Sequence, residues 1–280
     1  MNITVGEGVV PVMMYGTAWK EDQTKPLTIQ AIQNGFRSID TANQRKHYFE
    51  VAVGEAVAAV ISDGQVSRED LFLQTKYTYQ RGQDHRLPYD PDSDFKQQVQ
   101  QSFQSSLEHL QTSYIDSYVL HGPYSYPLLV DIDWEVWEAM EELHGEGKVR
   151  FLGISNATFE QLQVLFKRAK IKPTFVQNRC FASARWDYDV RQLCNDNNVI
   201  YQGFSLLTAN SRELQNPLMQ ELCEKYSKTL GQIVFRFAMQ RGMMILTGTT
   251  KEKRMLENLL IDDFSLTEDE LNHIENIAGN

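Results

Sequence analysis

The segment "GFRSIDTANQRKHYFEVAVGEAV", residues 35–57, joins two structural patterns. It begins as a buried strand in "FRSID" (36–40) and ends as a helix in "EVAVGEAV" (50–57). The turn between them carries an aspartate, two cations, a histidine and a tyrosine. A strand followed directly by a helix is the repeating unit of α/β folds. So many titratable groups in one turn indicate that the turn has a chemical task.

The same alternation of short apolar runs and longer helical patterns extends along the whole chain. Eight runs are predicted strands: 11–17, 36–40, 71–76, 114–121, 149–156, 174–178, 199–204 and 243–248. Among the helical intervals, residues 216–242 form one continuous stretch. Strands that are apolar on both faces favour an α/β fold of the (β/α)8 TIM barrel type, with residues 1–280 as a single domain. A doubly wound open sheet is the alternative.

The composition excludes several classes of protein. The chain has 280 residues, 42% of them hydrophobic, and a formal net charge of −10, so it lacks the basic face expected of a nucleic-acid binder. It contains neither a signal-peptide pattern nor about 18 consecutive apolar residues, so we expect a cytoplasmic protein without a membrane partner. The three cysteines, Cys180, Cys194 and Cys223, are too widely spaced for a disulfide framework or a cysteine-built zinc site.

Polar side chains stand at the ends of the predicted strands, where a barrel of this type has its active site. Asp40, Lys76 and His121 end the second, third and fourth strands. Taken singly, a polar residue at a strand end is a common turn former or helix cap. A buried aspartate and lysine should pair, and a purely structural ion pair is one reading of Asp40 and Lys76.

These segments resemble the aldo-keto reductase family. "GFRSIDTA" (35–42), "LFLQTK" (71–76) and "SLEHLQTSYIDSYVLHGP" (106–123) are similar to the family's catalytic segments. Its cofactor-binding segments resemble "GKVRFLGISN" (147–156), "KPTFVQN" (172–178) and "KEKRMLEN" (251–258), and "GQIVFRFAMQRG" (231–242) resembles its penultimate helix. The likeness runs from about residue 10 to 270 with the motifs in order. It implies reduction of aldehydes or ketones by hydride from NADP(H), with a small carbonyl compound as partner and a chain that is a monomer or weak oligomer.

The resemblance assigns the catalytic roles to Asp40, Tyr48, Lys76 and His121. Tyr48 would give a proton to the carbonyl oxygen, but a phenol of pKa near 10 is a poor donor. Lys76 is expected to lower that pKa, and Asp40 to hold the ammonium and keep it charged. His121 would orient the carbonyl. Because the hydride comes from the cofactor, no metal is required.

The turn that delivers the tyrosine departs from the commonest family pattern. There the tyrosine sits five residues after the aspartate and three before a glutamate; here Tyr48 is eight after Asp40 and two before Glu50. Counting back from Glu50 selects His47 instead. Tyr48 is preferred because it alone offers phenol chemistry, and His47 stays open as the alternative. The cations beside it are also typical of a solvated turn.

No GxGxxG or P-loop spacing is present, so a dinucleotide would have to bind as the family binds it. In the family pattern, Ser155, Asn156 and Gln177 would hydrogen-bond the nicotinamide carboxamide. Gly248 stands where many members carry a lysine, which leaves Arg254 to meet the 2′-phosphate that distinguishes NADP(H). The implied cofactor contacts are Gly16, Thr17, Asp40, Ser155, Asn156, Gln177, Phe204, Ser205, Leu206, Thr249, Arg254, Glu257 and Asn258.

The sequence indicates less about the substrate than about the cofactor. Gly122 follows His121 where members often carry tryptophan, so we expect a wider pocket there. Candidate aromatic walls, which could equally be packing, are Tyr77, Tyr79, Tyr124, Tyr126 and Trp186. Two other functions are open: a cofactor-binding regulatory protein or redox sensor similar to the potassium-channel beta subunits, with slow turnover, and an unrelated barrel hydrolase or isomerase that binds no NADPH.

Overall fold

The computed structural model describes residues 1–5 and 8–279. In this part of the chain, eight parallel strands close into a barrel in the order in which they occur, and the last pairs with the first. These strands are β3 (Met13–Gly16), β4 (Ser38–Asp40), β5 (Phe72–Tyr77), β6 (Ile115–Leu120), β7 (Val149–Ser155), β8 (Phe175–Arg179), β9 (Ile200–Phe204) and β10 (Met244–Thr247). All eight overlap the predicted strands. The predicted barrel is confirmed, and the alternative of a doubly wound open sheet is excluded.

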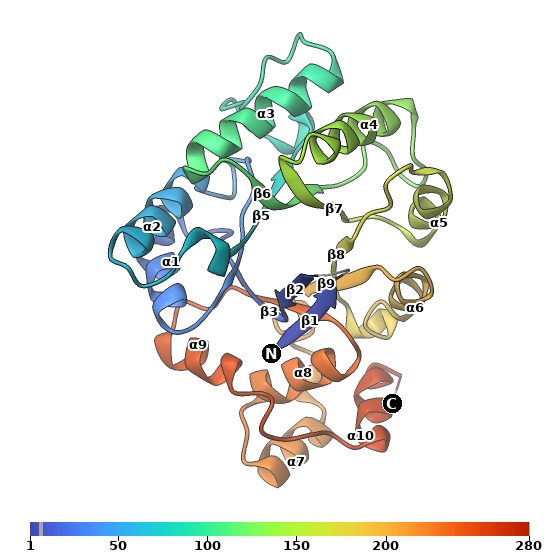
Figure 1. The fold of residues 1–280 in the computed structure, drawn as a ribbon. Helices are drawn as coiled ribbons and strands as arrows, with labels where there is room; N and C mark the ends of the chain where they lie inside the picture. Colours follow the sequence, from blue (N-terminus) through green and yellow to red (C-terminus); the bar gives the residue numbers. More distant parts are fainter. Residues whose placement is uncertain (6–7, 280) are drawn as a thin grey trace.

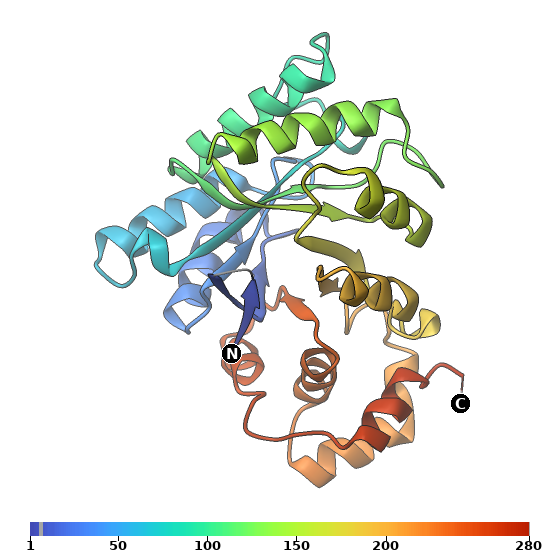
Figure 2. The ribbon, with the colours of Figure 1, turned by 45° about the vertical axis from the view of Figure 1, so that its right-hand side comes forward.

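Helices surround the barrel on all sides (Figure 1). They are α1 (Thr24–Gln33), α2 (Glu50–Ser62), α3 (Phe95–Leu110), α4 (Asp131–Gly145), α5 (Phe159–Arg168), α6 (Tyr188–Asp196), α7 (Pro217–Tyr226), α8 (Leu230–Gln240), α9 (Glu252–Leu259) and α10 (Glu268–Glu275). Short 3-10 turns occupy Glu21–Gln23, Arg68–Asp70, Gln80–Gly82, Ala182–Ala184 and Glu213–Gln215. In Figure 2, α7 and α10 lie side by side away from the barrel, joined by a Lys225–Glu270 ion pair.

The single helical stretch predicted over 216–242 is wrong. It divides into α7 and α8 because Ser227 has a left-handed backbone, with φ of 51°, which ends α7. The Thr229 hydroxyl then accepts a hydrogen bond from Gln232 N and starts α8 as a new capped helix.

Two further strands, β1 (Asn2–Val5) and β2 (Gly8–Pro11), pair antiparallel outside the barrel. Figure 1 shows them in front of the centre of the helix ring. Val5 and Val10 are buried there in a separate apolar cluster, which we call the basal cluster. Its buried members are Val5, Val10, Met14, Phe72, Phe175 and Met244. The sequence pattern does not indicate these two strands.

The parallel arrangement places the carboxyl ends of all eight strands at one end of the barrel, here called the mouth. Asp40 is in register with Gly16 on one side and Gln74 on the other, and Ser155 is in register with Gln177. Beyond β7 and β9 the backbone of Asn156 and Ser205 is left-handed, with φ of 54° and 58°. Such strained non-glycine residues cluster at functional sites. Within the described residues, no helix combines the length and apolarity needed to cross a membrane.

Candidate active site

A cavity of about 1040 Å³ opens at the mouth of the barrel. It collects almost every residue that the sequence singled out: Gly16, Asp40, Tyr48, His121, Ser155, Asn156, Gln177, Phe204, Ser205, Leu206, Thr249, Arg254, Glu257 and Asn258 all line it. Lys76 and Thr17 do not line it and lie buried near Asp40, where the Thr17 hydroxyl donates to Asp40 O at 2.9 Å. Residues from seven strand ends and from α9 thus share one cavity.

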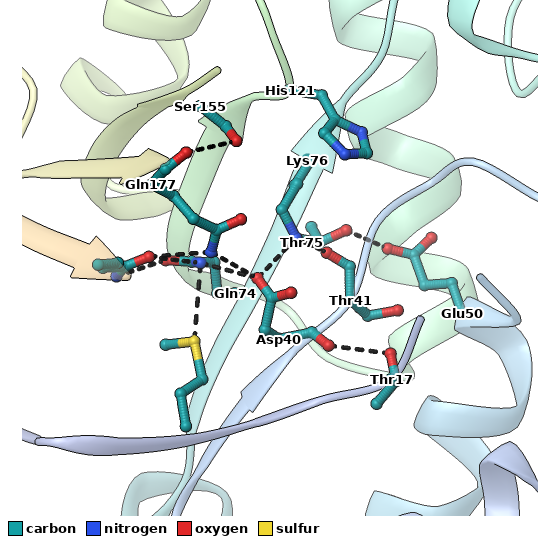
Figure 3. Close-up of polar contacts among 12 residues, drawn as sticks. Thr17, Asp40, Thr41, Glu50, Gln74, Thr75, Lys76, His121, Ser155 and Gln177 are labelled. Carbon is teal, nitrogen blue, oxygen red and sulfur yellow. Dashed lines mark hydrogen bonds and ion pairs between the residues drawn. The ribbon is translucent and has the colours of Figure 1, made fainter. Parts of the chain in front are cut away.

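Asp40 and Lys76 form a buried ion pair near the cavity wall (Figure 3). Lys76 Nζ lies 2.6 Å from Asp40 Oδ1 and 2.7 Å from Thr41 O, and the lysine side chain is 0% exposed. Asp40 Oδ1 also accepts hydrogen bonds from the amides of Gln74 at 2.8 Å and Gln177 at 3.1 Å. The expected pairing of Asp40 with Lys76 is therefore present, with amide donors that the sequence did not indicate.

Tyr48 lines the cavity between Lys76 and His121. The Lys76 ammonium lies 5.1 Å from the centroid of the Tyr48 ring. The His121 ring meets it edge-on, with the two centroids 5.8 Å apart. Nδ1 of His121 lies 2.7 Å from Thr78 Oγ1, which fixes the imidazole on that side. A phenol, an ammonium and an imidazole from three separate segments therefore meet at one wall of the cavity.

Burial dominates the titration of this group of side chains. It raises the pKa of Tyr48, and the Asp40 carboxylate raises it further. Burial lowers the pKa of Lys76, against the opposing effect of Asp40. Burial, followed by the charge of Lys76, holds the pKa of His121 well below its usual range, so the imidazole is neutral at physiological pH. The Tyr48 pKa is thus raised, opposite to the predicted lowering, because burial of the phenol and the nearby Asp40 carboxylate both act in that direction.

The long turn after β4 separates Tyr48 from His47. The His47 ring packs on Trp19 with centroids 4.0 Å apart, and Trp19 N donates to His47 O at 2.7 Å. Arg45 in the same turn pairs with Glu21 at 3.0 Å. His47 also lines the cavity but packs on Trp19, whereas Tyr48 lies next to both Lys76 and His121.

The predicted carboxamide-binding residues are partly engaged by the protein itself. Ser155 Oγ donates to Gln177 O at 2.7 Å, and the amide nitrogen of Asn156 donates to His121 O at 2.8 Å. The first bond joins the ends of β7 and β8, and the second joins the residue after β7 to the residue after β6. Ser155 Oγ also accepts a hydrogen bond from Asn156 Nδ2 at 3.1 Å, so the two side chains are bonded to each other as well.

Lys20 is a cavity neighbour that the sequence analysis missed. Its ammonium donates to Gly248 O at 2.8 Å and lies 5.1 Å from the centroid of the Tyr15 ring. A Cβ built on Gly248 would lie 3.5 Å from it, so an ammonium lies close to the position where many family members carry a lysine side chain. Burial lowers the Lys20 pKa to about 8. In the sequence "GTAWKED" this lysine is indistinguishable from a surface residue.

None of the five candidate aromatic residues lines the cavity, so the packing alternative is the one that the structure favours. Tyr77, Tyr79 and Trp186 are buried in the core. Trp19 lines the cavity instead; it is 71% exposed and has a left-handed backbone with φ of 62°. Its backbone conformation, which sequence alone does not indicate, turns the indole outward.

Comparison with known proteins assigns the family. The model of the Aldo/keto reductase family matches residues 12–278, so the chain belongs to this family. Among its relatives, the glyoxal reductase of Bacillus subtilis (strain 168) is 31% identical over 246 residues, which cover 88% of this chain and 80% of that protein. An NAD(P)H-dependent 6′-deoxychalcone synthase of Glycine max is 30% identical, over 96% of this chain and 87% of that one.

Solved structures agree. An aldo-keto reductase from a Medee basin deep-sea metagenome library has a TM-score of 0.83 and 26% identity, and the match covers 100% of this chain and 96% of that one. The predicted family is confirmed, and with it an oxidoreductase that reduces carbonyl groups with a nicotinamide cofactor. Membership excludes the unrelated hydrolase or isomerase. The relatives named here are enzymes, which gives no support to a regulatory subunit.

Proposed function

We propose that this chain reduces aldehydes or ketones with NADPH, using Tyr48 as proton donor, Lys76 and Asp40 as its supporting ion pair and His121 to orient the carbonyl. The observation that carries this proposal is the position of the Tyr48 ring on the cavity wall, between the Lys76 ammonium and the His121 imidazole. We further propose that residues 1–280 act as one domain, in the cytoplasm, as a monomer or weak oligomer.

The four side chains divide the reaction between them. With its raised pKa, Tyr48 keeps its proton until the carbonyl oxygen develops the charge of an alkoxide, which is a stronger base than a phenolate. When the Thr78 hydroxyl donates to Nδ1 of His121, Nε2 carries the imidazole proton and can donate to the carbonyl oxygen. Lys76 stabilises the phenolate that remains, and Asp40 holds the ammonium beneath the ring.

The residues of the cavity fit a phosphorylated nicotinamide dinucleotide, which when bound supplies the hydride. Lys20 is buried next to a carbonyl oxygen and an aromatic ring rather than a carboxylate, so its ammonium is available to an anion. Lys20 lies beside the cavity rather than in its lining, whereas Arg254 and Lys251 line it. We propose that Lys20 and Arg254 contact phosphate groups and that Phe204 stacks on the nicotinamide, giving a preference for NADPH over NADH.

The test is Tyr48→Phe, which removes the phenol hydroxyl and keeps the ring. We expect kcat for NADPH oxidation with aldehydes to fall by about 10²- to 10⁴-fold, the usual contribution of a positioned acid, while the Kd for NADPH stays within twofold. Tyr126→Phe is the matched control, since Tyr126 is 80% exposed outside the cavity. Near-normal turnover of Tyr48→Phe would contradict the assignment and direct attention to His47.

A further inference from the structure

Gln74 and Gln177 lie directly against the ion pair (Figure 3), and Gln202 bonds to both of them. Gln74 and Gln202 form a reciprocal amide pair: Gln74 Nε2 donates to Gln202 Oε1 at 2.9 Å, and Gln202 Nε2 donates to Gln74 Oε1 at 3.0 Å. Both side chains are 0% exposed. Gln74 comes from β5 and Gln202 from β9, four strands away in an eight-stranded barrel, so the pair spans the barrel interior.

The amide pair separates the polar mouth from the apolar base. On one side it contacts methionine sulfurs of the basal cluster: Gln74 Nε2 lies 3.7 Å from Met14 Sδ, and Gln202 Nε2 lies 3.7 Å from Met244 Sδ. On the other side it bonds to the cavity residues Asp40 and Gln177. Buried amides are costly unless their hydrogen bonds are made, so a pair in this place needs partners on both residues.

Asp40 and the Gln74–Gln202 pair together dictate which way the Gln177 amide turns. Gln177 Nε2 donates to Asp40 Oδ1 at 3.1 Å and to Gln202 Oε1 at 3.0 Å, which uses both hydrogens of the amide nitrogen. A reversed amide would direct its oxygen at the Asp40 carboxylate and at a second amide oxygen, and neither can donate to it. Gln177 therefore keeps its nitrogen in the cluster and its Oε1 as the free acceptor of a cavity-lining residue.

We propose that Gln74 and Gln202 are positioning residues that lock Gln177, so that it offers an acceptor, never a donor, to the carboxamide of the nicotinamide. This inference rests on the proposed function. A carboxamide has an N–H group to give to that acceptor, and a ring substituent without N–H has none. The lock therefore selects cofactors by the group at this position of the ring.

The experiment measures cofactor discrimination without turnover. Quenching of tryptophan fluorescence gives the Kd of NADP⁺ and of its 3-acetylpyridine analogue, in which an acetyl group without N–H replaces the carboxamide. We expect the wild-type protein to bind NADP⁺ about five- to tenfold more tightly, the usual value of one hydrogen bond. Gln74→Met and Gln202→Met preserve side-chain length and should each reduce the preference to about twofold or less. The first removes the partner that fixes the Gln202 amide and the second removes that amide, so only Asp40 still holds Gln177. The double variant should lose no more, because the two glutamines act through one network.

Gln98→Met is the matched control. Gln98 is also a buried glutamine, but it bonds to Ser93 O and Tyr77 OH outside the barrel interior. This variant should lose stability and keep the full preference, which separates positioning from a general effect of removing a buried amide. If one single variant fails to fold, the other single variant or the double variant carries the test, since each removes the same lock.

The outcomes separate this inference from the proposed function. A wild-type preference that survives in both Gln74→Met and Gln202→Met overturns the lock and leaves the reductase standing. Equal wild-type affinity for the two cofactors also overturns the lock, because Gln177 then makes no such bond. A wild-type protein that binds neither cofactor overturns the proposed function itself.

Discussion

The two ends of the barrel interior are stabilised in opposite ways. At the base, the basal cluster buries apolar side chains from β1, β2 and four barrel strands, among them Phe72 and Phe175 with ring centroids 5.7 Å apart. At the mouth, β4, β5 and β8 carry Asp40, Lys76 and Gln177, which bury charges and amides. Apolar burial gains free energy from water release, whereas a buried ion pair gains little beyond its desolvation cost. Burial at the base therefore contributes to the free energy of folding, whereas the buried polar groups at the mouth contribute little to it and supply the proposed catalytic side chains.

The largest effect should come from breaking the ion pair at the mouth. Lys76→Met leaves Asp40 buried without its cation, and we expect the free energy of unfolding to fall by about 3–5 kcal/mol. Turnover should also fall by about 10²-fold or more, because Tyr48 loses the charge beneath its ring. Urea denaturation and steady-state kinetics measure the two effects.

The double variant Asp40→Asn with Lys76→Met is the control for that experiment. It removes both charges but keeps a side-chain oxygen that can accept from Gln74 and Gln177, so most of the stability should return while turnover stays low. A double variant as unstable as Lys76→Met would show that the ion pair itself contributes net stability. The mouth would then stabilise the fold as the base does, and the proposed difference in folding free energy between the two ends would be wrong.

An intermediate effect is expected at the base. Val10 is 2% exposed in the basal cluster, and its neighbour Val9 is 63% exposed on the other face of β2. Val10→Ala should lower the free energy of unfolding by about 2 kcal/mol, from two buried methyl groups and the cavity they leave. Val9→Ala should change it by less than about 0.5 kcal/mol.

Neither valine variant should alter kcat or the Kd for NADPH, since β2 lies at the opposite end of the barrel from the cavity. Thermal unfolding followed by circular dichroism, with parallel kinetics, checks both statements. A change in kcat of more than about threefold in Val10→Ala would mean that the basal cluster also shapes the mouth.

The features that the sequence predicted are those encoded locally. Each barrel strand is an apolar run with a polar end, so "FRSID" indicates both the strand and the position of Asp40 within it. These polar residues share one cavity because the parallel arrangement places the carboxyl end of every barrel strand at the mouth. The roles of Asp40, Tyr48, Lys76 and His121 stay a prediction, carried by the resemblance and by their geometry.

The features that the sequence could not predict depend on contacts across the fold. β1 and β2 are four residues each and gain burial only by packing on the finished barrel. Gln74 and Gln202 are single polar residues inside strands, and barrel closure alone brings them together. The Tyr48 pKa moved opposite to expectation for the same reason, since burial is a property of the whole cavity. Ser227 ends α7 without a glycine or proline to mark the break.

The smallest predicted effect is a pH dependence of NADPH binding at the mouth, which the apolar base of the barrel cannot produce. Lys20 has its pKa lowered to about 8 by burial, so the free protein loses this ammonium as the pH rises through 8. If the protonated form binds phosphate, the Kd for NADPH should be constant below pH 8. It should then rise about fivefold by pH 9, equivalent to about 1 kcal/mol, and approach a tenfold rise at higher pH. Fluorescence titrations between pH 6.5 and 9.5 measure this dependence.

Two variants decide whether Lys20 causes the pH dependence. Lys20→Arg keeps its charge throughout this range and should bind NADPH with a flat profile. Lys20→Met carries no charge at any pH and should bind about tenfold more weakly than the wild type below pH 8, also with a flat profile. If the rise in Kd with pH persists in Lys20→Met, another group at the mouth titrates. Lys20 then does not take the place of the lysine that many family members carry at position 248. If Lys20→Met instead binds NADPH more weakly with a flat profile, the Lys20 ammonium causes the pH dependence. The mouth then keeps a buried lysine without a carboxylate partner, at a cost in folding free energy, because its charge binds an anion. The apolar base carries no such charge.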